Sequence, residues 1–248
     1  MRVRRFVLVL ALTLSHVGVA CADAPASDVP RAYVGVQGLV IVGQHRDVAG
    51  TQRGIGGAPL LEVREGTKRI AIHLEGIPVV SAPQRASAFY GQATPALGLF
   101  NGDIEAALDP RGRVWLGIGT TIINQRTPLP NIEQVVSSRL AGVRYTLVAR
   151  RPTRSPGHFI EAYFGVAPSL AGIDHYLYSD GVTPAVNKAE RASELDASIA
   201  FGWHHRHTEW LIGLRTLNFT ARYTATGQAA DRNVGIGPML EWRHLLGR

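Results

Sequence analysis

The sequence predicts an all-β fold, an antiparallel up-and-down β-barrel of eight to ten strands. Short runs of residues alternate between apolar and polar or small side chains, as strands with one buried face do. Segments with Gly, Pro or charged residues separate these runs and suit tight hairpin turns. After residue 24, no apolar stretch approaches the roughly 18 residues that a membrane helix needs, so only a closed barrel could span a membrane.

The first residues have the pattern of a secretory signal peptide. Arginines at positions 2, 4 and 5 precede the apolar run Phe6–Leu14, and small residues with A-x-A spacing follow. We therefore expect a signal peptide over residues 1–24 and a β-barrel domain over residues 25–248. Cys21, the single cysteine, is either removed with the leader or acylated as the first residue of a lipoprotein, although Gly18 stands where a lipobox usually has Leu.

The charge of the chain does not point to nucleic acid. The formal net charge is +7, and Lys68 and Lys188 are the only lysines, so almost all positive charge is arginine. These charges are spread along the chain, whereas a nucleic-acid interface needs a basic face. We expect no nucleic-acid partner.

The clearest alternation lies at residues 193–203. There Ile199 and Phe201 belong to an apolar face, and Glu194 and Asp196 belong to a polar one. Similar runs give ten expected strands, with eight as the alternative, and residues 131–140 have the spacing of a helix as a second possibility. The expected strands are 32–43, 58–64, 68–78, 97–108, 113–123, 138–150, 157–168, 192–204, 208–223 and 233–246.

Short and long connections alternate along the chain. Short turns are expected at 65–67, 109–112, 151–157 and 204–207, and long connections at 44–56, 80–92, 124–137, 169–190 and 224–232. Outer-membrane barrels show this alternation, with short turns on the periplasmic side and long loops outside.

Charged residues occupy the interior of several expected strands. In a membrane barrel they would face the lumen as a structural network of ion pairs, or line a narrow pore. In a soluble lipocalin-like barrel they would face water, and residues such as Ile199 and Phe201 would line an apolar ligand site. The candidate lumen residues are Arg144, Glu161, Glu194, Asp196, Arg222, Glu241 and Arg243.

Aromatic residues lie near the expected strand ends, at Tyr33, Trp203, Trp210, Tyr223 and Trp242, as in the interfacial girdles of membrane barrels. The last strand has a glycine before alternating apolar and aromatic residues over 237–242, a pattern similar to a barrel assembly signal.

With the leader and the strand rhythm, these features resemble small Gram-negative outer-membrane β-barrel proteins. The resemblance implies a place in the cell outer membrane. It also implies three partners: outer-membrane lipid, lipopolysaccharide and the barrel assembly machinery. The chain departs from this class in two ways. Arg243 and further residues follow Trp242, where the class commonly ends on an aromatic residue, and Pro238 cannot donate to a strand ladder.

No catalytic constellation is evident. His204, His205 and His207, with Glu209, form either a loop metal site or a polar hairpin turn, and their spacing matches no common zinc set. Ser155 and His158 lie in an expected turn with nothing to orient a base. We expect no catalytic residue, no cofactor and no metal.

The expected function is that of an outer-membrane barrel with a structural role, or with a binding or adhesion role through its loops. A soluble periplasmic carrier of a small apolar ligand and an outer-membrane enzyme that modifies lipid are the alternatives. The face that carries Glu194, Asp196 and Glu241 separates the membrane barrel from the soluble one.

Overall fold

The computed structural model describes residues 29–30, 32–47, 50–81, 84–87, 91–93, 96–129, 134–177, 184–223 and 231–246. The expected signal peptide and Cys21 lie outside these ranges. The strands of the main sheet are β1 (Tyr33–Asp47), β2 (Gly50–Gly66), β3 (Ile70–Ser81), β6 (Ala96–Ala107), β7 (Val114–Leu129), β8 (Gln134–Pro152), β9 (His158–Ala167), β10 (Leu170–Leu177), β11 (Pro184–His205), β12 (Thr208–Tyr223) and β13 (Asp231–Leu245).

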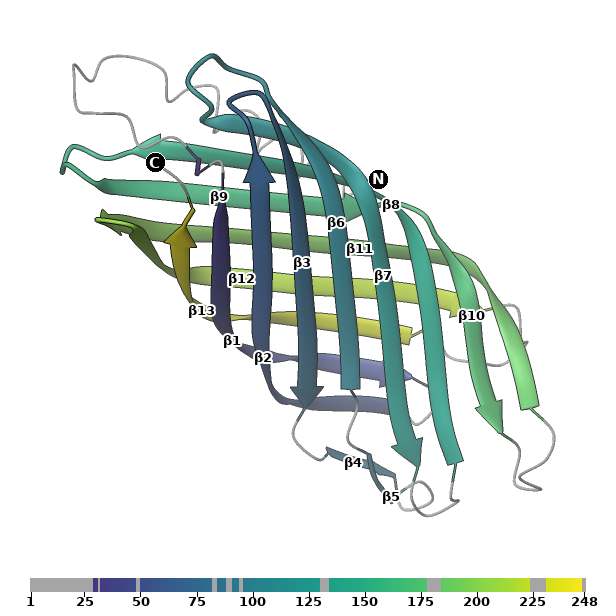
Figure 1. Cartoon of the computed structure of the whole chain (residues 1–248). Coiled ribbons are helices and arrows are strands. Elements are labelled where there is room, and N and C mark those ends of the chain that lie inside the picture. Colours follow the sequence, from purple (N-terminus) through teal and green to yellow (C-terminus); the bar gives the residue numbers. More distant parts are fainter. Residues whose placement is uncertain are drawn as a thin grey trace.

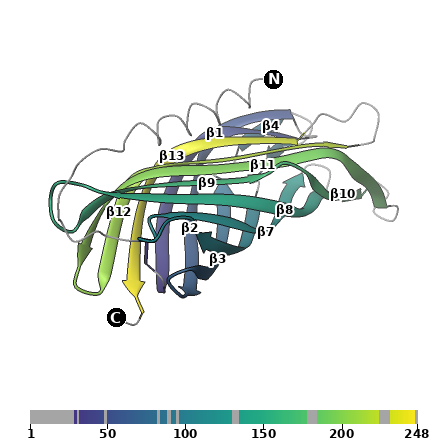
Figure 2. The ribbon, with the colours of Figure 1, turned by 90° about the horizontal axis from the view of Figure 1, so that it is seen from above.

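These strands form a closed antiparallel barrel. Each strand pairs with its neighbours along the chain, and β1 pairs with β13 to complete the circle. The strands of the front wall run steeply across those of the rear wall (Figure 1), and the view from above shows the interior between the walls (Figure 2). This crossing reflects the strand tilt that a closed barrel requires.

The barrel has ten strand positions, because β9 and β10 together fill one of them. Both pair with β8 on one side and with β11 on the other. Between Ala167 and Leu170, the register against β8 shifts by one residue, which marks a bulge. Pro168 lies in this break, where it removes no ladder hydrogen bond from a regular strand. Of the two predicted strand numbers, ten is the one observed.

The strands extend well into the predicted long connections. Predicted connection 44–56 is almost entirely strand, since β1 ends at Asp47 and β2 begins at Gly50. Most of 124–137 also belongs to strands, and the helical alternative is wrong over the described residues 134–140, which begin β8. Within predicted connection 80–92, a separate hairpin is formed by β4 (Gln84–Ser87) and β5 (Gly91–Ala93).

The two faces of the sheet are those of a membrane barrel. Ile199 and Phe201 lie on the outside, with 57% and 43% of their surfaces exposed, whereas Glu194, Asp196 and Glu241 are buried inside. Exposed Val, Ile, Leu and Phe residues recur on outward positions of strands all around the barrel. An apolar exterior around a charged interior is stable only in lipid, so the soluble-carrier alternative is wrong.

A row of tryptophans crosses three neighbouring strands at the end with the short turns. Trp203 pairs with Trp210, and Trp210 pairs with Trp242. The Trp203 and Trp210 rings stack with their centroids 6.5 Å apart. This row is the predicted girdle at the periplasmic interface. Tyr33 does not belong to the girdle, because its side chain is buried inside the barrel. The side chain of Tyr223 lies outside the described residues.

Among the described residues, no helix is long and apolar enough to cross a membrane.

The outer face predicts how a charge is tolerated at different depths. Leu214→Arg places a cation on the lipid-facing side of β12, deeper in the apolar belt and farther from the tryptophan row, and we expect it to lower the free energy of unfolding by about 2–4 kcal/mol. The control is Thr220→Arg, which lies on the same face of the same strand near its other end and should cost about 0–1 kcal/mol. Urea titration of the barrel folded in lipid vesicles measures both, and equal costs would contradict a membrane-embedded belt.

Candidate functional site

The interior of the barrel is the candidate site, and it is layered along the barrel axis. Charged side chains fill the half nearer the short turns. On β3, for example, His73 and Glu75 come first from that end, and the apolar Ile77 follows. On β6, Glu105 and Asp103 are likewise followed by Leu99. Strands with short periplasmic turns orient the charged half toward the periplasm.

Arg215 on β12 is one centre of the charged layer. Its guanidinium donates to both carboxylate oxygens of Asp196, at 3.0 and 2.5 Å, and to Glu75 at 2.5 Å. A third donor reaches the side-chain oxygen of Gln37 at 3.0 Å. Asn101 completes the cluster by donating to Glu75 at 2.9 Å. Because a guanidinium has five donors in a fixed plane, it can join strands from opposite walls in this way.

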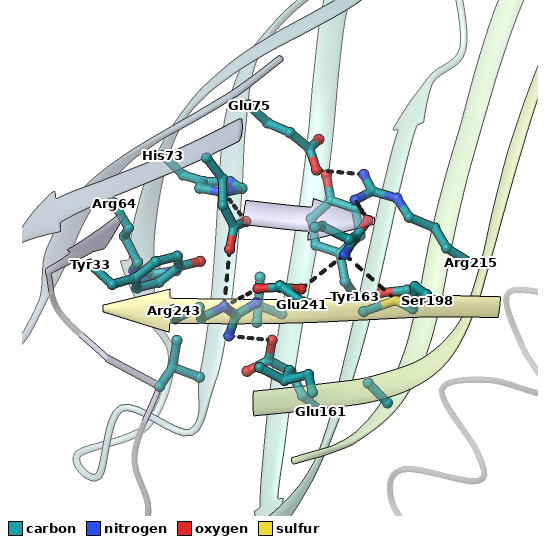
Figure 3. A pocket seen from close by; sticks show the side chains of 17 residues that line it. Tyr33, Arg64, His73, Glu75, Glu161, Tyr163, Ser198, Arg215, Glu241 and Arg243 are labelled. Carbon is teal, nitrogen blue, oxygen red and sulfur yellow. Dashed lines mark hydrogen bonds and ion pairs between the residues drawn. The ribbon is translucent and has the colours of Figure 1, made fainter. Parts of the chain in front are cut away.

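Arg243 on β13 is the second centre (Figure 3). It donates to Glu62 at 3.0 Å and lies 2.8 Å from Glu161, and it also contacts Glu241 on its own strand. Gln37 donates to Glu241 at 2.9 Å and therefore connects this cluster to Arg215. The two centres thus belong to one network.

Two further arginines extend the network across β8. Arg150 donates to Glu161 and to Glu209, with distances between 2.6 and 3.0 Å. Arg144 lies 3.2 Å from both Asp103 and Asp196 and also donates to the Tyr163 hydroxyl. Buried charges are costly unless paired and hydrogen-bonded, and the arginines meet this condition by bridging carboxylates of different strands.

Inward glycines make room for these long side chains. A Cβ atom at Gly165 would overlap the Arg144 guanidinium, and one at Gly35 would come within 2.6 Å of Glu62. The strand glycines of the sequence therefore serve the space requirement that a narrow, filled barrel imposes.

Aromatic rings close the charged layer on its periplasmic side. The guanidinium of Arg150 lies 3.8 Å from the ring centroid of Phe159, and that of Arg64 lies 4.4 Å from Trp115. Arg243 similarly lies 4.6 Å from Tyr33. Val29 packs with Trp115, and its backbone nitrogen donates to Gly112 at 3.1 Å. The segment before β1 thus lies against this end of the interior.

Apolar side chains close the charged layer on its other side. They are buried and come from strands all around the barrel, so they form a nearly continuous layer across the interior. Its members are Leu39, Leu60, Ile77, Leu99, Ile123, Leu140, Leu170, Leu217, Phe219 and Met239.

A small cavity lies within the charged layer. It has a volume of about 30 Å³ and lies between Tyr33, His73, Arg215 and Arg243 (Figure 3). This volume is about that of a single water molecule.

The structure places six of the seven predicted lumen residues inside the barrel. Arg144, Glu161, Asp196, Glu241 and Arg243 are buried and paired as described above. Glu194 is buried as well, but its closest ion-pair distance is 3.8 Å, to Arg144.

Arg222 was predicted for the lumen, and this prediction is wrong. It is exposed on the outer face of β12, because Arg215, Leu217, Phe219 and Ala221 occupy the inward positions.

Sequence reasoning missed most of the acids and three of the arginines in the network. The missed residues are Glu62, Arg64, His73, Glu75, Asp103, Glu105, Arg150, Glu209 and Arg215. A usable signal was present, because charges two residues apart occur in several strands, as in Glu62–Arg64 and Asp103–Glu105. This spacing puts both side chains on one face of a strand.

The histidine segment forms a hairpin turn. β11 ends at His205 and β12 begins at Thr208, and Arg206 has a left-handed φ of 55°. Nδ1 of His204 lies 3.7 Å from Glu209, whose carboxylate also accepts hydrogen bonds from Arg150. Among the described residues, no group of three or more His, Cys, Asp or Glu side chains is arranged to hold a metal ion.

The network predicts an asymmetry between its cations and its acids. Among the residues whose burial is described, nine buried acids outnumber five buried arginines. Arg215→Met would leave Asp196 and Glu75 without their shared cation, and we expect it to cost about 3–5 kcal/mol of unfolding free energy. Glu194→Gln removes an acid that is only loosely paired and should cost at most about 1 kcal/mol. Urea unfolding in vesicles compares the two, and a larger cost for Glu194→Gln would contradict the assigned network.

Comparison with known proteins agrees with the fold and gives no family. No protein-family model and no curated protein matches the sequence. Among solved structures, the outer membrane protease OmpT from Escherichia coli is similar at a TM-score of 0.51 and 9% identity, over 91% of this chain and 99% of that one.

Two further barrels match more distantly. The β domain of the Bordetella autotransporter BrkA has a TM-score of 0.40 and 12% identity, over 86% of this chain and 99% of that one. The toluene transporter TodX from P. putida has a TM-score of 0.39 and 7% identity, over 88% and 91%. The ten-stranded closure, the apolar exterior and the charged interior make this chain an outer-membrane β-barrel of the Gram-negative type.

Proposed function

We propose that this protein is a sealed outer-membrane barrel that acts at the cell surface, as a structural component or by binding through its outer strands and loops, without catalysis. The single observation that carries this proposal is the filled lumen. In the described part of the chain, nine carboxylates and five guanidiniums occupy it, and an apolar layer covers them on the extracellular side. Ions that cross such an interior would have to displace paired charges and then pass an apolar constriction.

The length of the strands supports a role at the surface. A strand needs about 9–11 residues to cross a membrane, but β11 has 22 and β8 has 19. The periplasmic ends are closed by short turns, so the excess length extends outward. The β4–β5 hairpin lies at this outer end beneath β3 and β6 in Figure 1, in contact with β2 and β7. Together these elements extend the sheet beyond the lipid on the extracellular side.

The geometry of the predicted serine and histidine pair gives no support to the enzyme alternative. Ser155 lies in the short turn between β8 and β9, and His158 is the first residue of β9, with its Nδ1 3.0 Å from the carbonyl oxygen of Pro156. An imidazole held by a backbone carbonyl in a periplasmic turn is not positioned to activate a nucleophile.

If the lumen is sealed as proposed, the barrel should conduct no ions. Purified protein reconstituted into planar bilayers should produce no stepwise conductance, because the network and the apolar layer leave no water-filled path. A porin of 16 strands reconstituted at the same protein concentration serves as the positive control. Reproducible conductance steps from the wild-type barrel would contradict the sealed interior and would favour the pore alternative.

The strand ends and the β4–β5 hairpin beyond the lipid predict an effect on the adherence of cells to coated surfaces. Replacing residues 82–95, which include the β4–β5 hairpin, by a short Gly-Ser turn should lower adherence of expressing cells to wells coated with collagen, fibronectin or mucin. The matched control replaces Arg206–His207, a periplasmic turn whose first residue has a left-handed φ, by Gly-Asn, which suits that turn. Adherence equal in cells with and without the protein would contradict a binding role and leave the structural one.

A further inference from the structure

The outer wall carries a groove across β2, β3, β6, β7 and β8. The part nearer the middle of the strands has a volume of about 470 Å³ and is mostly apolar, with Leu61, Leu74 and Phe100 among its lining residues. The part nearer the extracellular end has a volume of about 510 Å³, and Arg126 and Arg139 are among its lining residues. The two parts share Pro78, Gly98 and Asn124 and are therefore continuous.

Small residues and a break in the sheet produce this groove. A Cβ atom at Gly76 would have no neighbour within 4 Å, and one at Gly98 would have its nearest neighbour at 3.8 Å. The β2–β3 ladder is interrupted between Gly57, opposite Val80, and Leu61, opposite Gly76. Pro59 and Pro78 lie in the interrupted segments, and neither has an amide hydrogen to donate to the ladder.

The polarity of the groove changes along the membrane normal. One row of directly paired outward residues runs through Gly76, Phe100, Ile122 and Ala141 and is wholly apolar. The next row toward the outer end runs through Pro78, Gly98, Asn124, Arg139 and Ile173. The row beyond it pairs Arg126 with Ser137. The boundary of the lipid therefore falls at these rows, with both arginines just outside the apolar region.

Both guanidiniums are available to a ligand. Arg126 and Arg139 are exposed, and within the described part of the chain neither forms an ion pair. Asn124 pairs directly with Arg139, and Ser137 with Arg126, so that amide and hydroxyl groups lie between the two cations. Two arginines on adjacent strands repel each other unless an anion lies between them.

We propose that this groove binds one lipid A molecule of the outer leaflet. A phosphate of the headgroup accepts hydrogen bonds from Arg126 and Arg139, and an acyl chain lies in the apolar part between Leu61, Leu74 and Phe100. The arginines lie toward the extracellular ends of their strands, so the facing leaflet is the outer one. Because the site lies on the outer wall, this proposal is independent of the surface-binding role and of the sealed lumen.

The headgroup contact is tested on the full-length barrel in detergent. Thermal unfolding is followed with diphosphorylated lipid A, and with the same lipid after removal of its phosphates. Wild type should be stabilised more by the phosphorylated lipid. Arg126→Gln with Arg139→Gln should weaken the apparent affinity by about tenfold or more and abolish the preference for phosphate. The control, Arg151→Gln with Arg154→Gln, removes two exposed arginines at the periplasmic end and should behave as wild type.

The acyl contact is tested by filling the groove. Gly76→Leu adds a side chain where the wall has open space, so the fold should tolerate it while lipid A binding weakens. Gly38→Leu is the matched control, because Gly38 is also an outward strand glycine, with its nearest neighbour at 3.9 Å, but it lies on β1 away from the groove.

Each outcome bears on the proposal. Equal stabilisation of wild type by phosphorylated and dephosphorylated lipid A would overturn the headgroup contact. Equal stabilisation by inorganic phosphate alone would reduce the site to an anion site, and equal stabilisation by phosphatidylglycerol would remove the assignment to lipid A. Identical behaviour of Gly76→Leu and Gly38→Leu would overturn the acyl contact.

Discussion

The sharing of carboxylates among arginines inside the lumen is the interaction on which the rest of the structure depends. Arg243 contacts acids on β2, β9 and its own strand, and Arg215 contacts acids on β3 and β11. No hydrophobic core of the ordinary kind is available to a barrel whose apolar side chains face lipid. The charged network and the apolar layer on its extracellular side supply the interior contacts instead, and the inward strand glycines make room for their long side chains.

The membrane imposes the opposite arrangement on the exterior. Ile199, Ile212 and Leu240 are exposed because hydrocarbon surrounds them, and Trp203, Trp210 and Trp242 mark where that hydrocarbon ends on the periplasmic side. The exterior is nevertheless not uniform. Where Gly76, Pro78 and Gly98 meet the interrupted β2–β3 ladder, the wall is thin and hollowed. This interruption adds to the bulge between β9 and β10 and to the gap in the β1–β13 ladder, and it is the one that opens the outer wall.

Much of the fold could be predicted from the sequence, and the reason lies in its alternation. Within the membrane, an inward Glu194 and an outward Ile199 differ sharply in polarity. The alternation therefore predicts both the position of the strand and which of its side chains point into the barrel. Beyond the membrane, both faces of a strand meet water, and alternation disappears although the ladder continues. Residues 44–56 therefore resembled a connection, although the described residues 44–47 and 50–56 are strand. Arg222 was misplaced for the same reason, since an outward arginine outside the lipid resembles an inward one. On β12, Arg215 shares one face with the apolar Leu211 and Leu217, so the sequence did not mark it as a lumen residue. This face points inward, and Arg215 is central to the lumen network.

The seam between the first and last strands has a consequence for assembly. The β1–β13 ladder is interrupted at Pro238, between the pairs Leu39–Met239 and Val42–Ile236. Side chains cross this weak seam, since Gln37 bonds to Glu241 and Arg243 bonds to Glu62. The two residues of each hydrogen bond are about two hundred positions apart in the chain, so these bonds form only when β1 and β13 pair and close the barrel. Once formed, these hydrogen bonds hold β1, β2 and β13 together through the interior, so one terminal strand does not separate without breaking them. Closure is thus the step that commits the chain to its native state, and reopening requires many interior contacts to break together.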